Sequence, residues 1–302
     1  MPIIEVESLH KRYGDTVAVD DVSFNIEDGE IFGIIGPNGA GKTTTVECIA
    51  GLREPDRGSI TVAGLNPRRD RDQLRQILGM QLQESELAEK LKVGEALDLY
   101  ASFYERPAEI SQLVGALGLE DKLSTRYGKL SGGQKQRLSI ALALIGRPRI
   151  AVLDELTTGL DPQARRDTWA LIDEIRCQGV TIVLVTHFME EAERLCDRVA
   201  MINSGRVVSV GAPAALASAA GVLQTMRFHP SRPFDAVVLD ELSEVNTITR
   251  HGSTVEITGT GDLLGAVVAV LSQAGVAVEQ LRFEQRSLED AFVSLIGEAH
   301  HE

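Results

Sequence analysis

The sequence has few cysteines and a shortage of positive charge, and each shortage argues against a class of protein. Its three cysteines, Cys48, Cys177 and Cys196, are far apart and form no C-x-x-C pair. Neither a disulfide framework nor a zinc site is therefore expected, and a reducing cytoplasm suits the chain. Lysine and arginine total 30 against 44 aspartate and glutamate residues, for a formal net charge of -14 at pH 7. Because so acidic a chain repels polyanions, nucleic acid is not an expected partner.

Long hydrophobic runs are also absent. No window reaches the roughly 18 consecutive apolar residues that a membrane-spanning helix requires, and residues 1–5 lack the basic and then apolar layout of a signal peptide. We therefore expect the chain not to cross a membrane, although it can bind a partner that does. Its 302 residues and 43% hydrophobic content are those of a globular protein of about two domains.

The sequence does contain a complete glycine-rich loop. The residues GPNGAGKTT match the pattern G-x-x-x-x-G-K-[ST], follow the apolar run at 31–35 and lead into a helix-compatible segment at 44–50. Glycines allow backbone N–H groups to turn inward at a phosphate, and the following helix adds the positive end of its dipole. We therefore predict a phosphate-binding loop made of Gly36, Pro37, Asn38, Gly39, Ala40, Gly41, Lys42, Thr43 and Thr44.

Two residues of this loop and one upstream aromatic residue have expected roles. Lys42 is expected to reach the outer phosphates of a nucleotide, and Thr43 to offer its hydroxyl to Mg²⁺. Tyr13 could stack on the base through its ring face, or it could pack against the edge of a sheet, and both interpretations stay open. A GTPase is disfavoured because the sequence has no N-K-x-D motif for recognising guanine.

The patterning of the chain predicts where strands and helices lie in its first part. Alternating apolar and polar residues predict strands of a small β-rich part at 3–7, 22–26 and 59–63. Helical spacing from about residue 69 to residue 145 predicts a mostly helical insertion. Apolar runs and turn signals predict the remaining elements: buried strands at 150–153 and 181–185, a helix at 163–176, an acidic helix at 189–196, and a closing hairpin at 198–202 and 206–210.

A change of composition marks a domain boundary near Gly221. An alanine-rich stretch breaks the pattern there, and no phosphate-site motif follows it. The remainder is predicted to form a small α+β domain. Its expected elements are strands at 222–228, 254–258 and 276–283 and helices at 263–273 and 288–296.

Polar side chains follow two of the buried strands. Asp154 and Glu155 come directly after the strand at 150–153, and His187 follows the strand at 181–185. Carboxyl ends of buried parallel strands open into a ligand crevice, where these residues are expected. Because consecutive residues at the end of a strand point in different directions, we expect the two carboxylates to have different roles.

The residues LSGGQKQR at 130–137 resemble the signature motif of the ATP-binding cassette (ABC) family. The two carboxylates, the residues GLD at 159–161 and the Thr-His pair follow in the family's order, and the resemblance covers roughly residues 3 to 215. It implies an α/β fold, a P-loop NTPase cassette with a mixed-sheet core, an antiparallel β-rich subdomain and a helical subdomain. The implied domains are the cassette at 1–220, with its helical insertion at about 84–146, and a small α+β domain at 221–302.

The resemblance also implies cofactors and a subunit arrangement. ATP with Mg²⁺ is held between the phosphate loop of one subunit and the residues Ser131, Gly132, Gly133 and Gln134 of a second, which face the γ-phosphate. A serine and two glycines at a helix start suit this role, because they leave an anion-binding N-terminus open to close approach. Ser131 can cap the helix at the same time. One chain would therefore contribute one half to each of two sites, and a homodimer is expected.

Catalytic roles follow from the same resemblance. Asp154 would face Mg²⁺, usually through a water, Glu155 would orient and polarise the attacking water, and His187 would contact the γ-phosphate. The family usually has proline after the catalytic glutamate, whereas this chain has Leu156. That change removes no reacting group, so hydrolysis is expected to survive.

Two more residues are assigned by resemblance. Gln83 is the expected glutamine that connects the metal and the water to the helical insertion, with Gln81 as the alternative. Asp161 resembles the residue that links the two sites across the dimer. It can also cap the helix that begins at Pro162.

The residues at 154–162 and SLEDAF at 287–292 resemble the drug-resistance and ABC-2 type exporter subgroup. This implies an ATPase at the cytoplasmic face of the cell membrane that drives an integral-membrane permease, docked on the helical insertion, in the efflux of a drug, antibiotic or lipid-like substrate. The alternative is an ABC protein that acts on ribosomes or DNA. Such proteins commonly have two cassettes or a long coiled-coil insertion, and neither is present here. The C-terminal domain could be regulatory, dimer-stabilising or substrate-sensing.

Overall fold

A computed structural model describes residues 2–81, 87–219, 224–284 and 287–299 of the chain. The chain divides into two compact units, Met1–Pro213 and Ala214–Glu302. The division falls directly after the first residue of helix α8 (Pro213–Ala219), whereas the alanine-rich stretch placed the expected boundary after this helix. The last strand of the first unit ends at Gly211, before the alanine-rich stretch begins, and this explains why the division lies earlier than the expected boundary.

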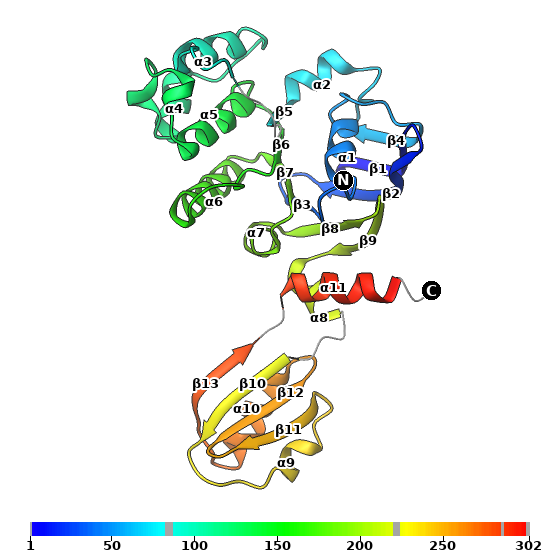
Figure 1. Ribbon diagram of the computed structural model, residues 1–302, viewed down its shortest axis with the longest axis vertical. Helices are drawn as coiled ribbons and strands as arrows, with labels where there is room; N and C mark the ends of the chain where they lie inside the picture. Colours follow the sequence, from blue (N-terminus) through cyan, green and yellow to red (C-terminus); the bar gives the residue numbers. More distant parts are fainter. Residues whose placement is uncertain (1, 82–86, 220–223, 285–286, 300–302) are drawn as a thin grey trace. The chain divides into compact units, whose positions relative to one another are not determined.

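The first unit is built on a mixed sheet of six strands in the order β5-β6-β7-β3-β8-β9 (Figure 1). Neighbours pair in parallel from β5 to β8, and β9 pairs antiparallel with β8. Strands β3, β6 and β7 are buried along their whole length, which explains their uninterrupted apolar sequences. The bounds are β3 Ile31–Ile35, β5 Leu78–Gln81, β6 Ile150–Asp154, β7 Thr181–Thr186, β8 Arg198–Asn203 and β9 Arg206–Gly211.

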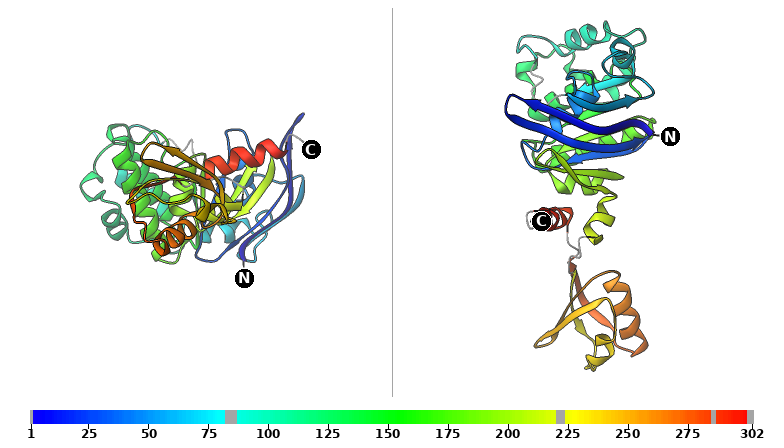
Figure 2. Two further views of the ribbon diagram at one scale, coloured as in Figure 1. Left: turned by 90° about the horizontal axis from the view of Figure 1, so that it is seen from below. Right: turned by 90° about the vertical axis from the view of Figure 1, so that its right-hand side faces the viewer.

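A second sheet of the first unit is antiparallel, in the order β2-β1-β4. Its main part is a long hairpin of β1 (Pro2–Tyr13) and β2 (Thr16–Glu27), and β4 (Arg57–Val62) pairs with β1 (Figure 2). The hairpin extends well beyond the two short strands that we expected. Its register shifts repeatedly beyond Val6, so the alternation of apolar and polar residues is lost there. Tyr13 is accordingly the last residue of β1 and not part of a loop.

The helices of the first unit connect its parallel strands and form the insertion between β5 and β6. Strand β5 lies within the region that was predicted to be mostly helical. It was missed because its 4 residues are too few to show a period. None of the described helices combines the length and apolar character needed to cross a membrane. The bounds are α1 Lys42–Ile49, α2 Arg71–Ile77, α3 Val93–Ala101, α4 Ile110–Ala116, η1 Glu120–Lys122, η2 Tyr127–Lys129, α5 Gly132–Leu144, α6 Pro162–Cys177 and α7 Met189–Leu195.

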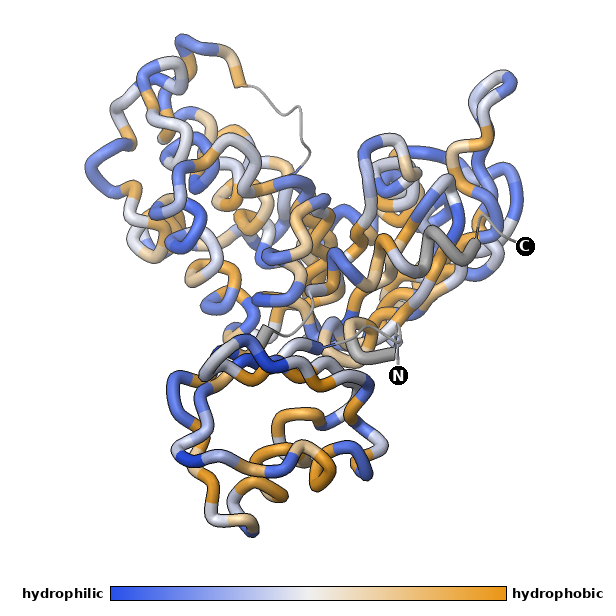
Figure 3. Tube along the Cα trace, turned by 60° about the horizontal axis from the view of Figure 1, so that its bottom comes forward, coloured by the Kyte–Doolittle hydropathy of each residue, from blue (hydrophilic) through white to orange (hydrophobic). Residues whose placement is uncertain are grey.

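One hydrophobic core joins the two sheets of the first unit. Ile4 and Ile26 of the hairpin belong to the same buried cluster as Phe32 of β3 and Val46 of α1. Phe24 and Phe32 stack with their ring centroids 5.3 Å apart. Figure 3 shows hydrophobic segments gathered along the strands of this unit, with hydrophilic residues mostly in the connections. Because α1 packs on this core, the loop before it is held at the carboxyl end of β3.

The second unit has a four-stranded antiparallel sheet in the order β11-β12-β10-β13. Helix α10 occupies the predicted residues, Leu263–Gln273, and its Val267 and Leu271 share a buried cluster with Phe228. Strand β11 was not predicted, because most of its residues are exposed. The other bounds are β10 Gln224–Pro230, α9 Val237–Asp240, β11 Val245–His251, β12 Thr254–Gly259, β13 Val278–Glu284 and α11 Leu288–Ala299.

Replacing Phe228 by alanine tests whether the second unit has a core of its own. Phe228 is fully buried, and its ring stacks on Phe234 with the centroids 6.4 Å apart. The cavity left by Phe228→Ala should lower the free energy of unfolding of this unit by about 3–5 kcal/mol, with the first unit unchanged. Calorimetry of the full chain measures both transitions.

The control for this experiment is Val268→Ala, at an exposed position of α10. It should change the free energy of unfolding by less than about 1 kcal/mol. An equal loss in the two variants, or a loss spread over both units, would contradict the separate core.

Candidate functional site

The phosphate loop is held by the backbones of three other segments. Gly36 has φ +152°, and a Cβ there would lie 2.0 Å from the carbonyl oxygen of Ile202. Gly41 has φ +100°, and a Cβ there would lie 2.2 Å from the carbonyl oxygen of Ala18. In the β8–β9 turn, the Gly205 N–H donates to the Ala40 carbonyl at 3.0 Å. The two glycines are therefore required by packing as well as by backbone conformation.

Lys42 is the first residue of α1 and lies inside the loop. It is only 5% exposed, and its Nζ donates to the carbonyl oxygens of Gly36 at 2.8 Å and Pro37 at 3.0 Å. Burial lowers the pKa of Lys42, and the negative charges of Glu155 and Asp154 oppose that shift. The loop thus holds a cation in the position that would meet an anionic ligand.

Asp154 ends β6 and is buried beside Thr43. Its Oδ2 lies 3.5 Å from the Thr43 hydroxyl, and its Oδ1 has no hydrogen-bond partner among the described residues. Burial, and then the charge of Glu155, raise the pKa of Asp154 to about 6, while Lys42 opposes the rise. A buried carboxylate with an unpartnered oxygen, next to a hydroxyl, is a set of hard oxygen donors that fits Mg²⁺.

Glu155 and His187 contact each other directly. Glu155 Oε1 lies 3.1 Å from His187 Nδ1, with the two side chains 8% and 28% exposed. Glu155 has φ +50°, a left-handed conformation that is uncommon for any residue except glycine. Its N–H donates to the Val185 carbonyl at 2.8 Å, which ties this turn to β7. Asp154 therefore points to Thr43 and Glu155 to His187, as the strand geometry led us to expect.

Gln81 also contacts the site. It is the last residue of β5, is 7% exposed, and its Oε1 accepts the Asp154 N–H at 3.1 Å. Sequence reasoning considered Gln81 only as the alternative to Gln83, and Gln83 lies outside the described residues. The feature that brings Gln81 to the site is the register of the sheet, in which Gln81 pairs with Leu153, the residue before Asp154. That register cannot be found from a motif.

The remaining candidate residues lie at the N-termini of α5 and α6. Ser131 caps α5, because its Oγ accepts the Gln134 N–H at 3.3 Å and the Gln134 side chain accepts the Ser131 N–H at 3.0 Å. Asp161 caps α6 by accepting the N–H groups of Gln163 at 3.0 Å and Ala164 at 2.9 Å. Both capping predictions are confirmed.

These two helix N-termini line one pocket of about 440 Å³. Gly132 and Gly133 belong to its lining together with Ser131 and Asp161, and none of the described residues that line it belongs to the phosphate loop. Arg137 pairs with an aspartate of α6 at 3.3 Å and so joins the two helices. The chain therefore presents the signature motif and the phosphate loop as separate surfaces.

Tyr13 lies apart from the buried part of the site. Its side chain is 41% exposed at the end of β1, with Lys11 Nζ 5.6 Å and the Arg53 guanidinium 6.0 Å from the centroid of its ring. An exposed ring can stack on a purine base, and its place at the sheet edge also suits simple packing. Both interpretations made from the sequence are compatible with this position.

A glycine-rich loop between a buried strand and a helix, with carboxylates at the end of a neighbouring strand, defines a P-loop nucleoside triphosphatase. Residues 19–158 match the family described as ABC transporter. The chain is 37% identical over 307 residues to Nod factor export ATP-binding protein I from Burkholderia lata, with 98% of each chain covered. The chain belongs to the ABC transporter family, whose ATP-binding subunits hydrolyse ATP and work with membrane permeases.

Solved structures have the same fold. A structure described as the ATP binding subunit of an ABC transporter matches with a TM-score of 0.64 and 32% identity, covering 71% of this chain and 91% of that one. A dimeric ATP-binding cassette, in a post-hydrolysis state bound to ADP and Pi, matches with a TM-score of 0.63 and 26% identity. That match covers 69% of this chain and 98% of the other. The expected α/β cassette fold is confirmed.

Two alanine substitutions within the loop test the packing argument. Gly41→Ala places a Cβ against the Ala18 carbonyl at a left-handed φ, whereas Gly39→Ala, at φ +80°, meets nothing within 4 Å. We expect Gly39→Ala to cost about 1 kcal/mol of unfolding free energy from backbone strain alone. Gly41→Ala should cost about 2 kcal/mol more because of the clash. Urea unfolding without nucleotide measures both, and equal costs would refute the packing explanation.

Proposed function

We propose that this chain is the ATPase subunit of an exporter, and that two copies close around two ATP molecules and thereby change the state of a membrane permease. The observation that carries the proposal is the arrangement of Asp154, Glu155 and His187 around the loop that holds Lys42. These residues follow three adjacent strands, β6, β7 and β3. One substrate can therefore contact all of them at the shared edge of the sheet.

The residues of the phosphate loop bind the triphosphate in this proposal. The backbone N–H groups from Gly36 to Thr44 surround the phosphates, and Lys42 exchanges its two carbonyl contacts for phosphate oxygens. Tyr13 stacks on the adenine from the end of β1. Because Lys42 is already buried in the loop, little reorganisation is needed when ATP binds.

Thr43, Asp154 and Gln83 provide the proposed ligands for Mg²⁺. The ion that they would hold would supply positive charge against the phosphates as the bond to the γ-phosphate breaks. Asp154 reaches it directly or through a water, since its Oδ1 is buried without a partner among the described residues. Glu155 orients and polarises the attacking water, and His187 contacts the γ-phosphate and holds Glu155 in place through the 3.1 Å contact.

A second copy of the chain completes each site. Ser131, Gly132, Gly133 and Gln134 of that copy face the γ-phosphate, and Asp161 connects the two sites. The separation of the signature pocket from the phosphate loop supports this arrangement, because one chain then exposes half of each site. The dimeric cassette with ADP and Pi supports it as well.

Glu155→Gln tests the catalytic assignment. The amide keeps the size of the side chain but is not a general base, so ATP turnover should fall about a hundredfold or more. ATP binding should be retained. The fraction of dimer in ATP and Mg²⁺ should rise, because the closed dimer is no longer reopened by hydrolysis. Phosphate release and gel filtration measure the two effects.

Glu174→Gln, at an exposed position of α6, is the control and should behave as the unaltered chain. Normal turnover in Glu155→Gln would contradict the assignment.

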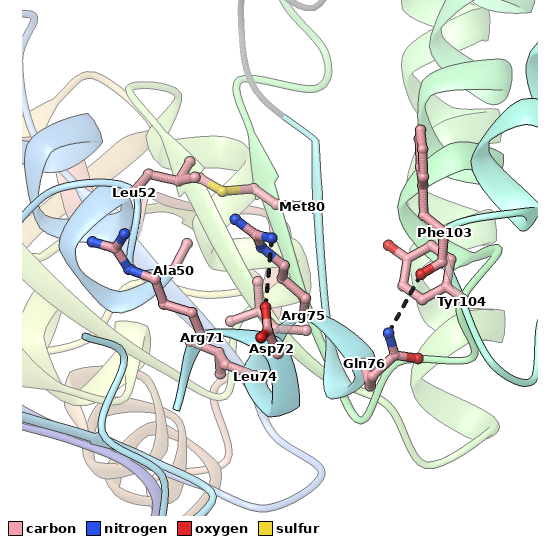
Figure 4. Close-up of a pocket in the computed structure, with 12 residues that line it drawn as sticks. Ala50, Leu52, Arg71, Asp72, Leu74, Arg75, Gln76, Met80, Phe103 and Tyr104 are labelled. Carbon is pink, nitrogen blue, oxygen red and sulfur yellow. Dashed lines mark hydrogen bonds and ion pairs between the residues drawn. The ribbon is translucent and has the colours of Figure 1, made fainter. Parts of the chain in front are cut away.

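The proposed permease contact is a pocket of about 620 Å³ in the first unit (Figure 4). One side is formed by Leu52, Arg71, Arg75 and other residues near α2, and the opposite side by Phe103 and Tyr104, which follow α3. The Gln76 amide donates to the Phe103 carbonyl at 3.4 Å and links the two sides. Leu52 and Phe103 are 54% and 62% exposed, an apolar surface that suits a helix end of a membrane protein.

Phe103→Asp tests this contact. A charge at the rim should prevent permease binding, while ATP turnover by the isolated chain changes less than about twofold, because the described residues that line this pocket include none of the phosphate loop and none of Asp154, Glu155 and His187. The measurement is co-purification of the tagged chain with one multi-span protein from detergent-solubilised membranes, identified by mass spectrometry. Leu123→Asp, at another exposed apolar position outside the pocket, should leave co-purification intact. Equal recovery with both variants would contradict the assigned surface.

We propose export at the cytoplasmic face of the membrane, of a drug, antibiotic or lipid-like molecule. Relatives named for Nod factor export support the direction of transport. The second unit, with its own core, is proposed as a regulatory or dimer-stabilising module. Deleting it and measuring the dimer fraction distinguishes that role from substrate sensing.

A further inference from the structure

A buried carboxylate next to the catalytic pair has no role in the function proposed above. Glu191 lies on α7 and is 1% exposed, although its neighbour Glu190 on the same helix has a 74% exposed side chain. Burying an ionisable group costs free energy unless other groups compensate it. A carboxyl group so fully buried near a site therefore needs an explanation.

Glu191 contacts three segments that belong to the site. Its Oε1 accepts the indole N–H of Trp169 on α6 at 3.3 Å. Burial raises the pKa of Glu191, and the nearby hydroxyls of Thr186 and Thr157, both fully buried, oppose that rise together with the indole. Thr186 directly precedes His187, and Thr157 belongs to the turn that follows Glu155. The carboxylate thus lies behind both members of the catalytic pair.

The hydrogen bonding of this cluster is incomplete. Glu191 Oε2 and Thr157 Oγ1 are both buried, and within the described part of the chain neither has a partner at hydrogen-bond distance. Thr186 Oγ1 already accepts the Phe188 N–H at 3.0 Å. A small movement of the turn that carries Thr157 would join the two unpartnered atoms and remove both penalties at once.

That same turn carries Glu155 in a left-handed conformation. A hydrogen bond from Thr157 to the carboxylate would fix the turn against the loop that carries His187. From this juxtaposition we infer that Glu191 is a positioning residue, which holds the turn of Glu155 and the loop of His187 in one arrangement through Thr157 and Thr186. The inference rests on the proposed catalytic role of Glu155.

The first test compares Glu191→Gln with Glu190→Gln in steady-state ATP hydrolysis by the full chain. Glu191→Gln keeps an acceptor for Trp169 but replaces the second carboxylate oxygen with an amide group that cannot accept from Thr157, so kcat should fall about tenfold to a hundredfold, with KM for ATP changed less than about threefold. Glu190→Gln should match the unaltered chain. An unchanged kcat in Glu191→Gln, or a change confined to KM, overturns the inference.

A double substitution distinguishes positioning from a general loss of stability. If Glu191 acts through Glu155, adding Glu191→Gln to Glu155→Gln should cause no further loss of turnover. A further loss of similar size overturns the inference. Normal turnover in Glu155→Gln alone would instead refute the proposed function, so the two failures can be told apart.

Thr157 provides the test if Glu191→Gln does not fold. Thr157→Val removes the hydroxyl at nearly constant volume and should lower kcat about tenfold, whereas Thr157→Ser keeps the hydroxyl and should restore most of it. Trp169 is the single tryptophan of the chain, so its fluorescence should respond to ATP in the unaltered chain and less so in Thr157→Val. Equal kcat values for the valine and serine variants overturn the inference.

Discussion

The site depends on two adjacent carboxylates buried beside a single lysine. Asp154 lies at the end of a fully buried strand, where desolvation and the charge of Glu155 both disfavour its ionised form. Lys42 opposes this, but its own ammonium is partly desolvated and already bonded to backbone carbonyls. One cation cannot balance two carboxylates in a poorly hydrated place. A divalent cation, which we propose that these carboxylates bind, would supply the missing positive charge.

This constraint explains the backbone around it. The left-handed turn at Glu155 directs the second carboxylate away from the first and toward His187. The cost of that conformation, about 1–3 kcal/mol, is reduced by the hydrogen bond of the Glu155 N–H to β7. Leu156, where the family usually has proline, is fully buried beneath the turn and adds apolar packing. Leu156 thus provides a buried apolar side chain directly after Glu155.

Motifs with fixed local geometry could be predicted from the sequence, and contacts set by strand register could not. The loop from Gly36 to Thr44, the caps Ser131 and Asp161 and helix α10 lie where they were expected, because each depends on a few consecutive residues. The length of the β1–β2 hairpin and the existence of β5 were missed. Both depend on pairing with strands that are distant in the sequence.

The sequence by itself determined the class of this protein, because the chemistry of phosphate binding requires glycines, a lysine and carboxylates at set spacings along the chain. Tertiary structure alone decided which of these groups meet. The order β6-β7-β3 places Asp154, His187 and the phosphate loop at one edge of the sheet. The same packing brings Gln81 to the Asp154 backbone and encloses Glu191 behind Glu155 and His187. Such contacts join residues far apart in the chain, and only close packing in three dimensions specifies them.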